Sequence, residues 1–250
     1  MTKFTQNINI FDFDGTLTTE TWPKFWVWIK KFGFHGEKRN DELEDSLAEY
    51  RRKHIGNELE TFFAFFNDLL NDNGETISVE ELMEGEKYIV YNPGVLEFLE
   101  ESDVKNYIIT GGLKDFIENL SVAKHFDGVY GTPVIYDEKG NISGIGEVVT
   151  DDKKVDAIRD ILVRNGRVKD DCRGVFFIGD GFSDEDSLRF VHEHGGKAIF
   201  VHQLDDDDHY YEYNKNIYER LNKDGMIDYC MIADYKRDSP LNKVLRRDNE

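Results

Sequence analysis

The sequence has few cysteines, no long apolar run and no segment typical of a secretion signal. Its two cysteines, Cys172 and Cys230, lie far apart and have no CxxC or histidine partner at metal-ligand spacing. No apolar run approaches the ~20 residues of a membrane span, and the charged motif at Asp12 comes too early for a signal peptide. We therefore expect a reduced, cytoplasmic protein without a membrane segment.

Positive charge is also scarce. The 250 residues include 31 Lys and Arg against 51 Asp and Glu, which gives a formal net charge of −20. This charge opposes binding to nucleic acid or to an anionic membrane, so an anionic substrate needs a local cluster of cations. The aromatic fraction of 13% indicates a packed globular protein, and the length suits one domain or one domain with an insertion.

The order of the predicted elements indicates a parallel α/β sheet with a helical insertion near its start. Residues 8–14 have the pattern of a strand that ends in carboxylates, and apolar residues recur at helical spacing from 19 to 91. Beyond the break at Asn92, Pro93 and Gly94, strands and helices alternate. We predict an α/β core of residues 1–17 and 91–250, interrupted by a helical domain over 18–90.

The elements expected after the break are regularly spaced. Helices are predicted over 95–101, 113–121, 153–164 and 184–194, and strands over 106–110, 174–180, 197–201 and 229–233. A hairpin is predicted over 134–149, around Gly140.

Polar residues follow the ends of several predicted strands. Because parallel strands present their carboxyl ends at one edge of a sheet, these residues are expected to converge there. They are Asp12, Asp14, Thr110, Asp180 and Asp184, with Lys153 and Lys154 at the start of the helix after the hairpin. Clustered carboxylates repel one another unless a cation neutralises them, and an all-oxygen ligand set suits Mg²⁺. The sequence therefore predicts a magnesium site.

The two acids at the end of the first predicted strand can have different chemical roles. Side chains alternate along a strand, so Asp12 and Asp14 are expected to point the same way, one to attack and one to handle protons. Gly15 allows the backbone to turn close to a ligand, and the Thr16 hydroxyl can brace the loop. Alone, an Asp-x-Asp pair is more often a turn or a helix cap.

The choice between the two lysines depends on helical spacing. Lys154 places Ile158 and Ile161 at offsets of four and seven, as an inward-facing helix start requires, so Lys154 is preferred and Lys153 stays open.

Four segments, in this order, resemble the four motifs of the haloacid dehalogenase superfamily. They are DFDGTLT (12–18), the threonine of IITGG (108–112), the lysine of DDKK (151–154) and GDGFSDED (179–186). The resemblance covers most of the chain outside the helical insertion. It implies a Rossmann-like core with a helical cap, and hydrolysis of a phosphate ester that requires Mg²⁺.

The resemblance also implies roles for individual residues. Asp12 is the nucleophile that forms an aspartyl-phosphate, and Asp14 is the general acid and base. Phosphoryl oxygens are bound by Thr110 and Lys154 with the backbone of Gly15, Thr16 and Gly111. The metal ligands are Asp12, the Asp14 carbonyl and Asp180, with Asp184 supporting the metal or orienting the lysine, and with Glu185 as a less favoured substitute for Asp184.

The stretch from TGG (110–112) to GDGFSD (179–184) resembles the phosphoserine phosphatase-like branch, with one departure. In that branch a glutamate after the first motif reads the substrate amine. Glu20 is the substrate-binding candidate here, but it lies one position early, so phosphoserine itself is not favoured. Asp14 favours phosphate esters over dehalogenation, because a halide leaves without a proton. The expected partner is a small phosphorylated metabolite.

Several alternatives stay open. The cap tryptophans Trp22, Trp26 and Trp28 are either a wall for a ring or quaternary ammonium group, or simply the core of the cap. The run Asp205–Asp208 is a solvated turn or a cation site. A catalytically silent phosphate-binding protein of the same fold is the alternative function. A receiver-like module is disfavoured by length, and a nucleotide-binding enzyme by the lack of a P-loop or GxGxxG motif. The sequence gives no signal for an oligomeric state.

Overall fold

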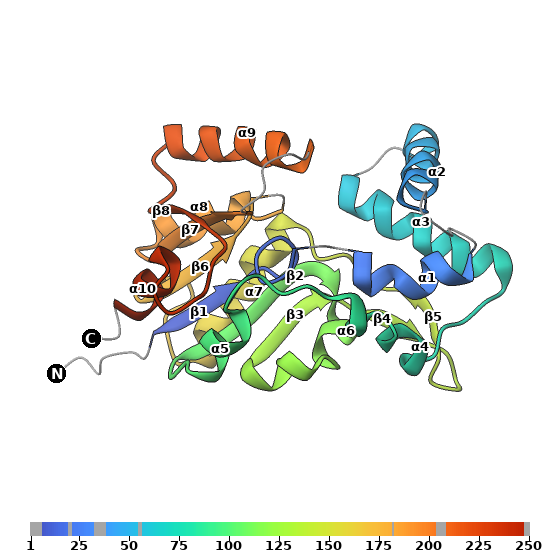
Figure 1. Ribbon diagram of the computed structural model, residues 1–250, viewed down its shortest axis with the longest axis horizontal. Helices are drawn as coiled ribbons and strands as arrows, with labels where there is room; N and C mark the ends of the chain where they lie inside the picture. The colour runs from blue at the N-terminus through green and yellow to red at the C-terminus, as the bar shows by residue number, and fades with distance from the viewer. Residues whose placement is uncertain are drawn as a thin grey trace.

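A six-stranded parallel sheet forms the centre of the protein (Figure 1), in the strand order β3-β2-β1-β6-β7-β8. The computed structural model describes residues 7–19, 22–32, 39–54, 57–181, 183–203 and 209–247. The strands are β1 (Ile8–Phe11), β2 (Lys105–Leu113), β3 (Gly128–Thr132), β6 (Val175–Gly179), β7 (Lys197–His202) and β8 (Tyr229–Ile232). All five neighbouring pairs are parallel, which confirms the predicted α/β fold.

Side chains alternate between two apolar clusters on opposite faces of the sheet. In β6, Phe176 and Ile178 belong to one cluster and Phe177 to the other, because successive side chains of a strand point to opposite faces. The first cluster is covered by α5 (Val95–Glu100), α6 (Lys114–Glu118) and α10 (Pro240–Arg247), and the second by α7 (Asp151–Arg164), α8 (Glu185–Glu193) and α9 (His209–Lys223). Near-continuous apolar strands are typical of a sheet covered on both faces.

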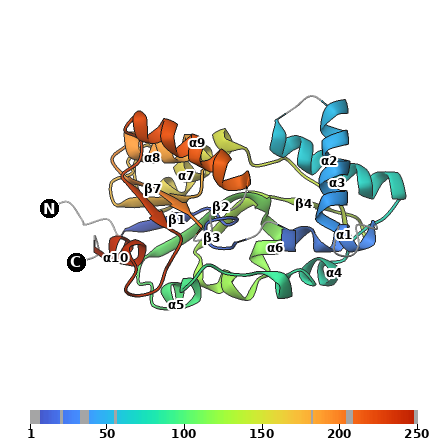
Figure 2. The same cartoon turned by 45° about the horizontal axis from the view of Figure 1, so that its top comes forward.

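The helical segments between β1 and β2 form the predicted cap, which stands to one side of the sheet (Figure 2). They are η1 (Trp22–Phe25), α1 (Trp26–Lys31), α2 (Arg39–Lys53), α3 (Glu58–Asn73), α4 (Val79–Met83) and η2 (Glu86–Tyr88), followed by α5. After η2 the chain returns to the core with α5, which packs Phe98 edge-on against Phe11 of β1. The exact domain boundaries at residues 18 and 90 stay a prediction.

Aromatic side chains hold the cap together. The rings of Phe25 and Phe66 stack with centroids 4.6 Å apart, and Trp28 packs edge-on against both rings. Trp28 is fully buried, so it belongs to the core of the cap and is not a wall for a ligand. Trp26 packs against Tyr88 at 4.3 Å, and the Trp22 side chain lies outside the described part of the chain.

A hairpin of the core reaches the cap. It consists of β4 (Val134–Tyr136) and β5 (Ile142–Ile145), where the sequence predicted a hairpin. The Asn67 amide of α3 accepts a hydrogen bond from Ile145 N at 2.9 Å and donates one to Ile145 O at 3.2 Å. Ile77 and Ile142 exchange two backbone hydrogen bonds as in an antiparallel bridge. These bonds attach the cap to a part of the core that lies far in sequence from the two segments that join the cap and the core.

Within the described ranges, no helix is both long and apolar enough to cross a membrane.

Candidate active site

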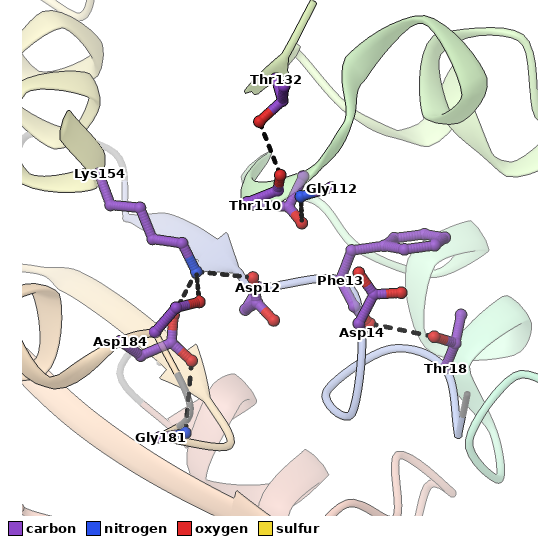
Figure 3. A network of polar contacts seen from close by, with 12 residues as sticks. Asp12, Phe13, Asp14, Thr18, Thr110, Gly112, Thr132, Lys154, Gly181 and Asp184 are labelled. Carbon is purple, nitrogen blue, oxygen red and sulfur yellow. Dashed lines mark hydrogen bonds and ion pairs between the residues drawn. The ribbon is translucent and has the colours of Figure 1, made fainter. Parts of the chain in front are cut away.

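The site lies at the ends of β1 and β6 and beside the last residues of β2, which contains Thr110 and runs on to Leu113. Because β1 is hydrogen-bonded to both β2 and β6, Phe11 lies opposite Ile108 on one side and Ile178 on the other. The residues that follow these positions therefore meet at one edge of the sheet. Figure 3 shows Asp12 and Thr110 at this edge, with Lys154 reaching toward Asp12 from α7.

Three carboxylates form a buried cluster. One carboxylate oxygen from each of Asp12, Asp180 and Asp184 lies within 4.8 Å of the other two, and all three side chains are buried. The sequence predicted this convergence from the strand ends alone.

Lys154 connects two of these acids (Figure 3). Its fully buried ammonium donates hydrogen bonds to Asp12 Oδ1 at 2.9 Å, Asp184 Oδ1 at 2.7 Å and Ser183 Oγ at 2.9 Å. An ammonium group has three N–H donors, so these bonds use all of them. Lys153 instead donates to Val148 O and pairs with Glu147, so the structure places Lys154 in the cluster and Lys153 outside it.

The electrostatics of the cluster follow from burial. Burial raises the pKa of Asp12 well above its usual value; Lys154 opposes this shift, and Asp184, Asp180 and Asp14 add to it. Burial disfavours the charged form of Lys154, but Asp12 and Asp184 outweigh that effect and raise its pKa above the usual value. Three carboxylates against one ammonium leave excess negative charge, and their oxygens are the donors that a hard divalent cation prefers. The residues present therefore fit a metal ion.

The loop after Asp12 turns tightly beneath Asp180. Gly15 has a φ of +74°, and a Cβ at this position would collide with Oδ2 of Asp180. Its carbonyl accepts a hydrogen bond from Gln203 Nε2 at 2.6 Å. The carbonyl of Thr16 accepts from Asn92 Nδ2 at 2.8 Å and from the Tyr235 hydroxyl at 3.2 Å.

Thr16 braces this loop differently from the expectation. Its backbone carbonyl makes the bracing contacts, and its buried hydroxyl has no hydrogen-bond partner among the residues that the structure describes. The loop is therefore held through the Thr16 carbonyl and not, as the sequence predicts, through the Thr16 hydroxyl.

Gly15→Ala is expected to destabilise the fold by more than Gly140→Ala and to weaken the metal site. A left-handed backbone alone costs an L-residue about 1–2 kcal/mol. Gly140 has a φ of +82° and nothing within 4 Å of an added Cβ, so it is a matched control for backbone strain. Thermal unfolding with and without Mg²⁺ checks this: only Gly15→Ala should lose the stabilisation by Mg²⁺. Equal responses of the two variants would contradict the role given to Gly15.

Asp14 lies apart from the acid cluster and is paired with the cap. Its carboxylate forms an ion pair with Lys24 of η1, whose side chain is only 3% exposed. A Cβ on Gly112 would lie 2.6 Å from Lys24 Nζ, 3.1 Å from Thr110 Oγ1 and 3.2 Å from Asp14 Oδ2. These three polar groups therefore surround one point, which is open only because residue 112 is glycine.

Lys24 was not identified from the sequence. It lies within WPKFW, where a cation interrupts an apolar pattern at helical spacing. Lysine is almost never fully buried unless it is paired, so a lysine on the apolar face of a cap helix is a usable signal.

The segment Thr110–Gly112 is fixed by hydrogen bonds of its backbone. Thr110 Oγ1 accepts a hydrogen bond from Gly112 N at 2.9 Å. The Gly111 carbonyl accepts a hydrogen bond from Thr132 Oγ1 at 2.7 Å, and a Cβ on Gly111 would lie 2.7 Å from Leu59 of α3. Figure 3 shows Thr132 next to this segment. The absence of a side chain at Gly111 thus lets the cap approach the core.

Other candidates are not brought to the site. Glu185 forms ion pairs with Arg189 and Arg220, so Asp184 and not Glu185 lies in the cluster. Glu20 and the run Asp205–Asp208 lie outside the described residues, so their predicted roles are not tested.

Solved structures with the same fold are numerous. A phospho-aspartyl intermediate analogue of phosphoserine phosphatase is 17% identical with a TM-score of 0.62, over 97% of this chain and 99% of that one. Cytosolic 5′-nucleotidase IIIB bound to cytidine is 16% identical with a TM-score of 0.56, over 97% and 86%. A hydrolase of Salmonella enterica serovar Typhi is 18% identical with a TM-score of 0.56, over 78% of this chain, which spans only 61% of that one.

The sequence comparison identifies the family. No curated protein sequence matches the chain significantly. The model of the haloacid dehalogenase-like hydrolases matches residues 10–189, a range that contains Asp12, Asp14, Thr110, Lys154 and the acids that follow β6. With the fold and the clustered motif residues, this match shows that the chain belongs to the haloacid dehalogenase-like hydrolase family.

Proposed function

We propose that the protein is a Mg²⁺-dependent phosphatase that hydrolyses a small phosphomonoester through an aspartyl-phosphate on Asp12. The observation that carries this proposal is the position of Asp12: it is buried at the end of β1, held by Lys154, and grouped with Asp180 and Asp184. A carboxylate fixed in this way beside a cation site is suited to attack phosphorus.

The first half of the reaction transfers the phosphoryl group to the protein. An Asp12 carboxylate oxygen attacks phosphorus while the ester bond breaks, and Asp14 gives its proton to the leaving alcohol. In the second half, Asp14 takes a proton from water, which attacks the aspartyl-phosphate and releases inorganic phosphate. The Asp14 carboxylate forms an ion pair with Lys24, and its Oδ2 and Thr110 Oγ1 lie about the same point next to Gly112.

The remaining motif residues bind the metal ion or the phosphoryl oxygens and offset their charge. Asp12, the Asp14 carbonyl and Asp180 would hold Mg²⁺, which supplies positive charge to offset the carboxylates and the phosphoryl oxygens. The Thr110 oxygen already accepts from Gly112 N, so its hydroxyl hydrogen is left to donate to a phosphoryl oxygen. Asp184 orients Lys154, and the backbone of Gly15, Thr16 and Gly111 lines the phosphate position.

A substrate panel tests the proposal. Phosphate release is measured with Mg²⁺ from phosphoserine, phosphocholine, pyridoxal phosphate, sugar phosphates and a generic aryl phosphate. Turnover of one compound well above the others would support the proposal and name the leaving group. No release from any compound would favour the catalytically silent, phosphate-binding alternative.

Asp14→Asn is expected to lower kcat by about 10²–10⁴-fold, the usual contribution of a positioned acid or base. The loss should be larger for an alkyl ester than for an aryl ester, because a phenolate leaves without full protonation. Rates for both esters check this expectation, with Asp170→Asn as a control, because Asp170 is 49% exposed and pairs with Arg159. The same loss for both esters would argue against proton donation by Asp14.

A further inference from the structure

Lys24 is a buried cation that the cap places beside the reacting groups, and no motif accounts for it. We propose that the Lys24 ammonium binds an oxygen of the substrate's phosphoryl group, so that the cap itself completes the phosphate site. This inference rests on the proposed phosphatase function and adds one recognition residue to it.

The first argument is a count of hydrogen-bond donors. Lys154 uses all three N–H donors on Asp12, Ser183 and Asp184, so it has none left for a phosphate oxygen while these bonds last. Among the residues that the structure describes, the Lys24 ammonium has Asp14 as its only hydrogen-bond or ion-pair partner. Within the described part of the chain, two N–H donors of a side chain that is 3% exposed thus have no acceptor. Buried donors are normally satisfied, so these two favour an acceptor that is brought in.

The second argument is the position of the ammonium. Lys24 Nζ, Thr110 Oγ1 and Asp14 Oδ2 lie around the point where Gly112 lacks a Cβ. Thr110 is the proposed ligand of a phosphoryl oxygen and Asp14 the proposed proton donor to the leaving oxygen. A donor between them can reach the phosphoryl group on the side of the leaving alcohol. Lys24 Nζ also lies over the Phe25 ring, 5.8 Å from its centroid, a cation–π contact that provides no oxygen or nitrogen acceptor.

The third argument is charge. The chain carries a net charge of −20, so a dianionic substrate is attracted only where cations are concentrated. Lys154 enters the site from the core helix α7, and Lys24 enters it from η1 of the cap. The two cations belong to the two parts of the molecule that must meet around the phosphate.

The test measures binding of inorganic phosphate in the presence of Mg²⁺ by calorimetry. Lys24→Met is expected to weaken binding about 10- to 100-fold, the range for the loss of a hydrogen bond to a charged group. Lys30→Met is the matched control, because Lys30 lies in the same cap, is 57% exposed and pairs with Glu84. It should bind phosphate as the wild type does. Lys24→Gln, which keeps a donor without the charge, replaces Lys24→Met if that variant unfolds.

The outcomes separate this inference from the proposed function. A fall in kcat with unchanged phosphate affinity would show that Lys24 only positions Asp14, and would overturn the inference. If the wild type turns over substrate, and Lys24→Met and Lys30→Met both match it in phosphate affinity and rate, the inference is also overturned. The phosphatase function then stays intact. If the wild type itself neither binds nor releases phosphate, both proposals fail. Weaker phosphate binding in Lys24→Met alone supports the inference.

Discussion

Asp12→Asn is expected to abolish Mg²⁺-dependent phosphate release, with a fall in kcat of at least about 10⁴-fold. The amide is a poor nucleophile, and it replaces a carboxylate that accepts a hydrogen bond from Lys154. The substitution also removes one of three grouped acids, so metal affinity should fall as well. The rate is measured with the ester that the panel selects, and thermal unfolding shows whether the variant is folded.

A matched change elsewhere separates chemistry from overall charge. Asp170→Asn removes the same charge from a side chain that is 49% exposed and pairs with Arg159. This variant should keep wild-type rates. Normal turnover by Asp12→Asn would show that Asp12 is not the nucleophile.

Removal of the metal is expected to lower the rate by about 10³-fold, since a bound metal contributes several kcal/mol of transition-state stabilisation, and to lower stability as well. Without a cation, Asp12, Asp180 and Asp184 share a buried space with one ammonium, and their mutual repulsion is uncompensated. Mg²⁺ at 100 times its dissociation constant should stabilise the fold by about 2.7 kcal/mol. Turnover and thermal unfolding are compared after chelation, after return of Mg²⁺, and in sodium chloride of equal ionic strength.

Two results would contradict this expectation. Full activity after exhaustive chelation would show that the acids act without a metal. An unfolding temperature that responds equally to sodium chloride and to Mg²⁺ would show that the cluster has no specific cation site.

The core and the motif residues were predictable from sequence because they depend on local patterns. An apolar run followed at once by a carboxylate marks a parallel strand that ends at the site, and this holds for Asp12 after β1 and Asp180 after β6. The helix that carries Lys154 was predictable because Ile158 and Ile161 keep helical spacing on its buried face.

Other elements were not predicted. The strand β3 contains Gly128 and Gly131, which lower strand propensity, and it depends on pairing with β2. The helices α9 and α10 are not among the elements predicted, although both carry a helical pattern. Leu241, Val244 and Leu245 recur at helical spacing in α10, and the buried Ile217 and Leu221 are four residues apart in α9.

The position of Lys24 could not be derived from sequence. Which cap residue lies next to the loop of Asp12 and Asp14 depends on how η1 packs, through Phe25, against Phe66 and the rest of the cap core. Sequence periodicity indicates which residues are buried, and it does not indicate which buried residue reaches across to Asp14.

Trapping of the covalent intermediate tests the central claim most directly. The enzyme is mixed with excess substrate and Mg²⁺, quenched in acid within one turnover and digested, and the peptide that contains residues 7–19 is analysed by mass spectrometry. A phosphoryl group on Asp12, absent from Asp14 and absent in Asp12→Asn, is the predicted result. Rapid phosphate release with no phosphorylated Asp12, or with the phosphoryl group on another residue, would contradict the proposed mechanism.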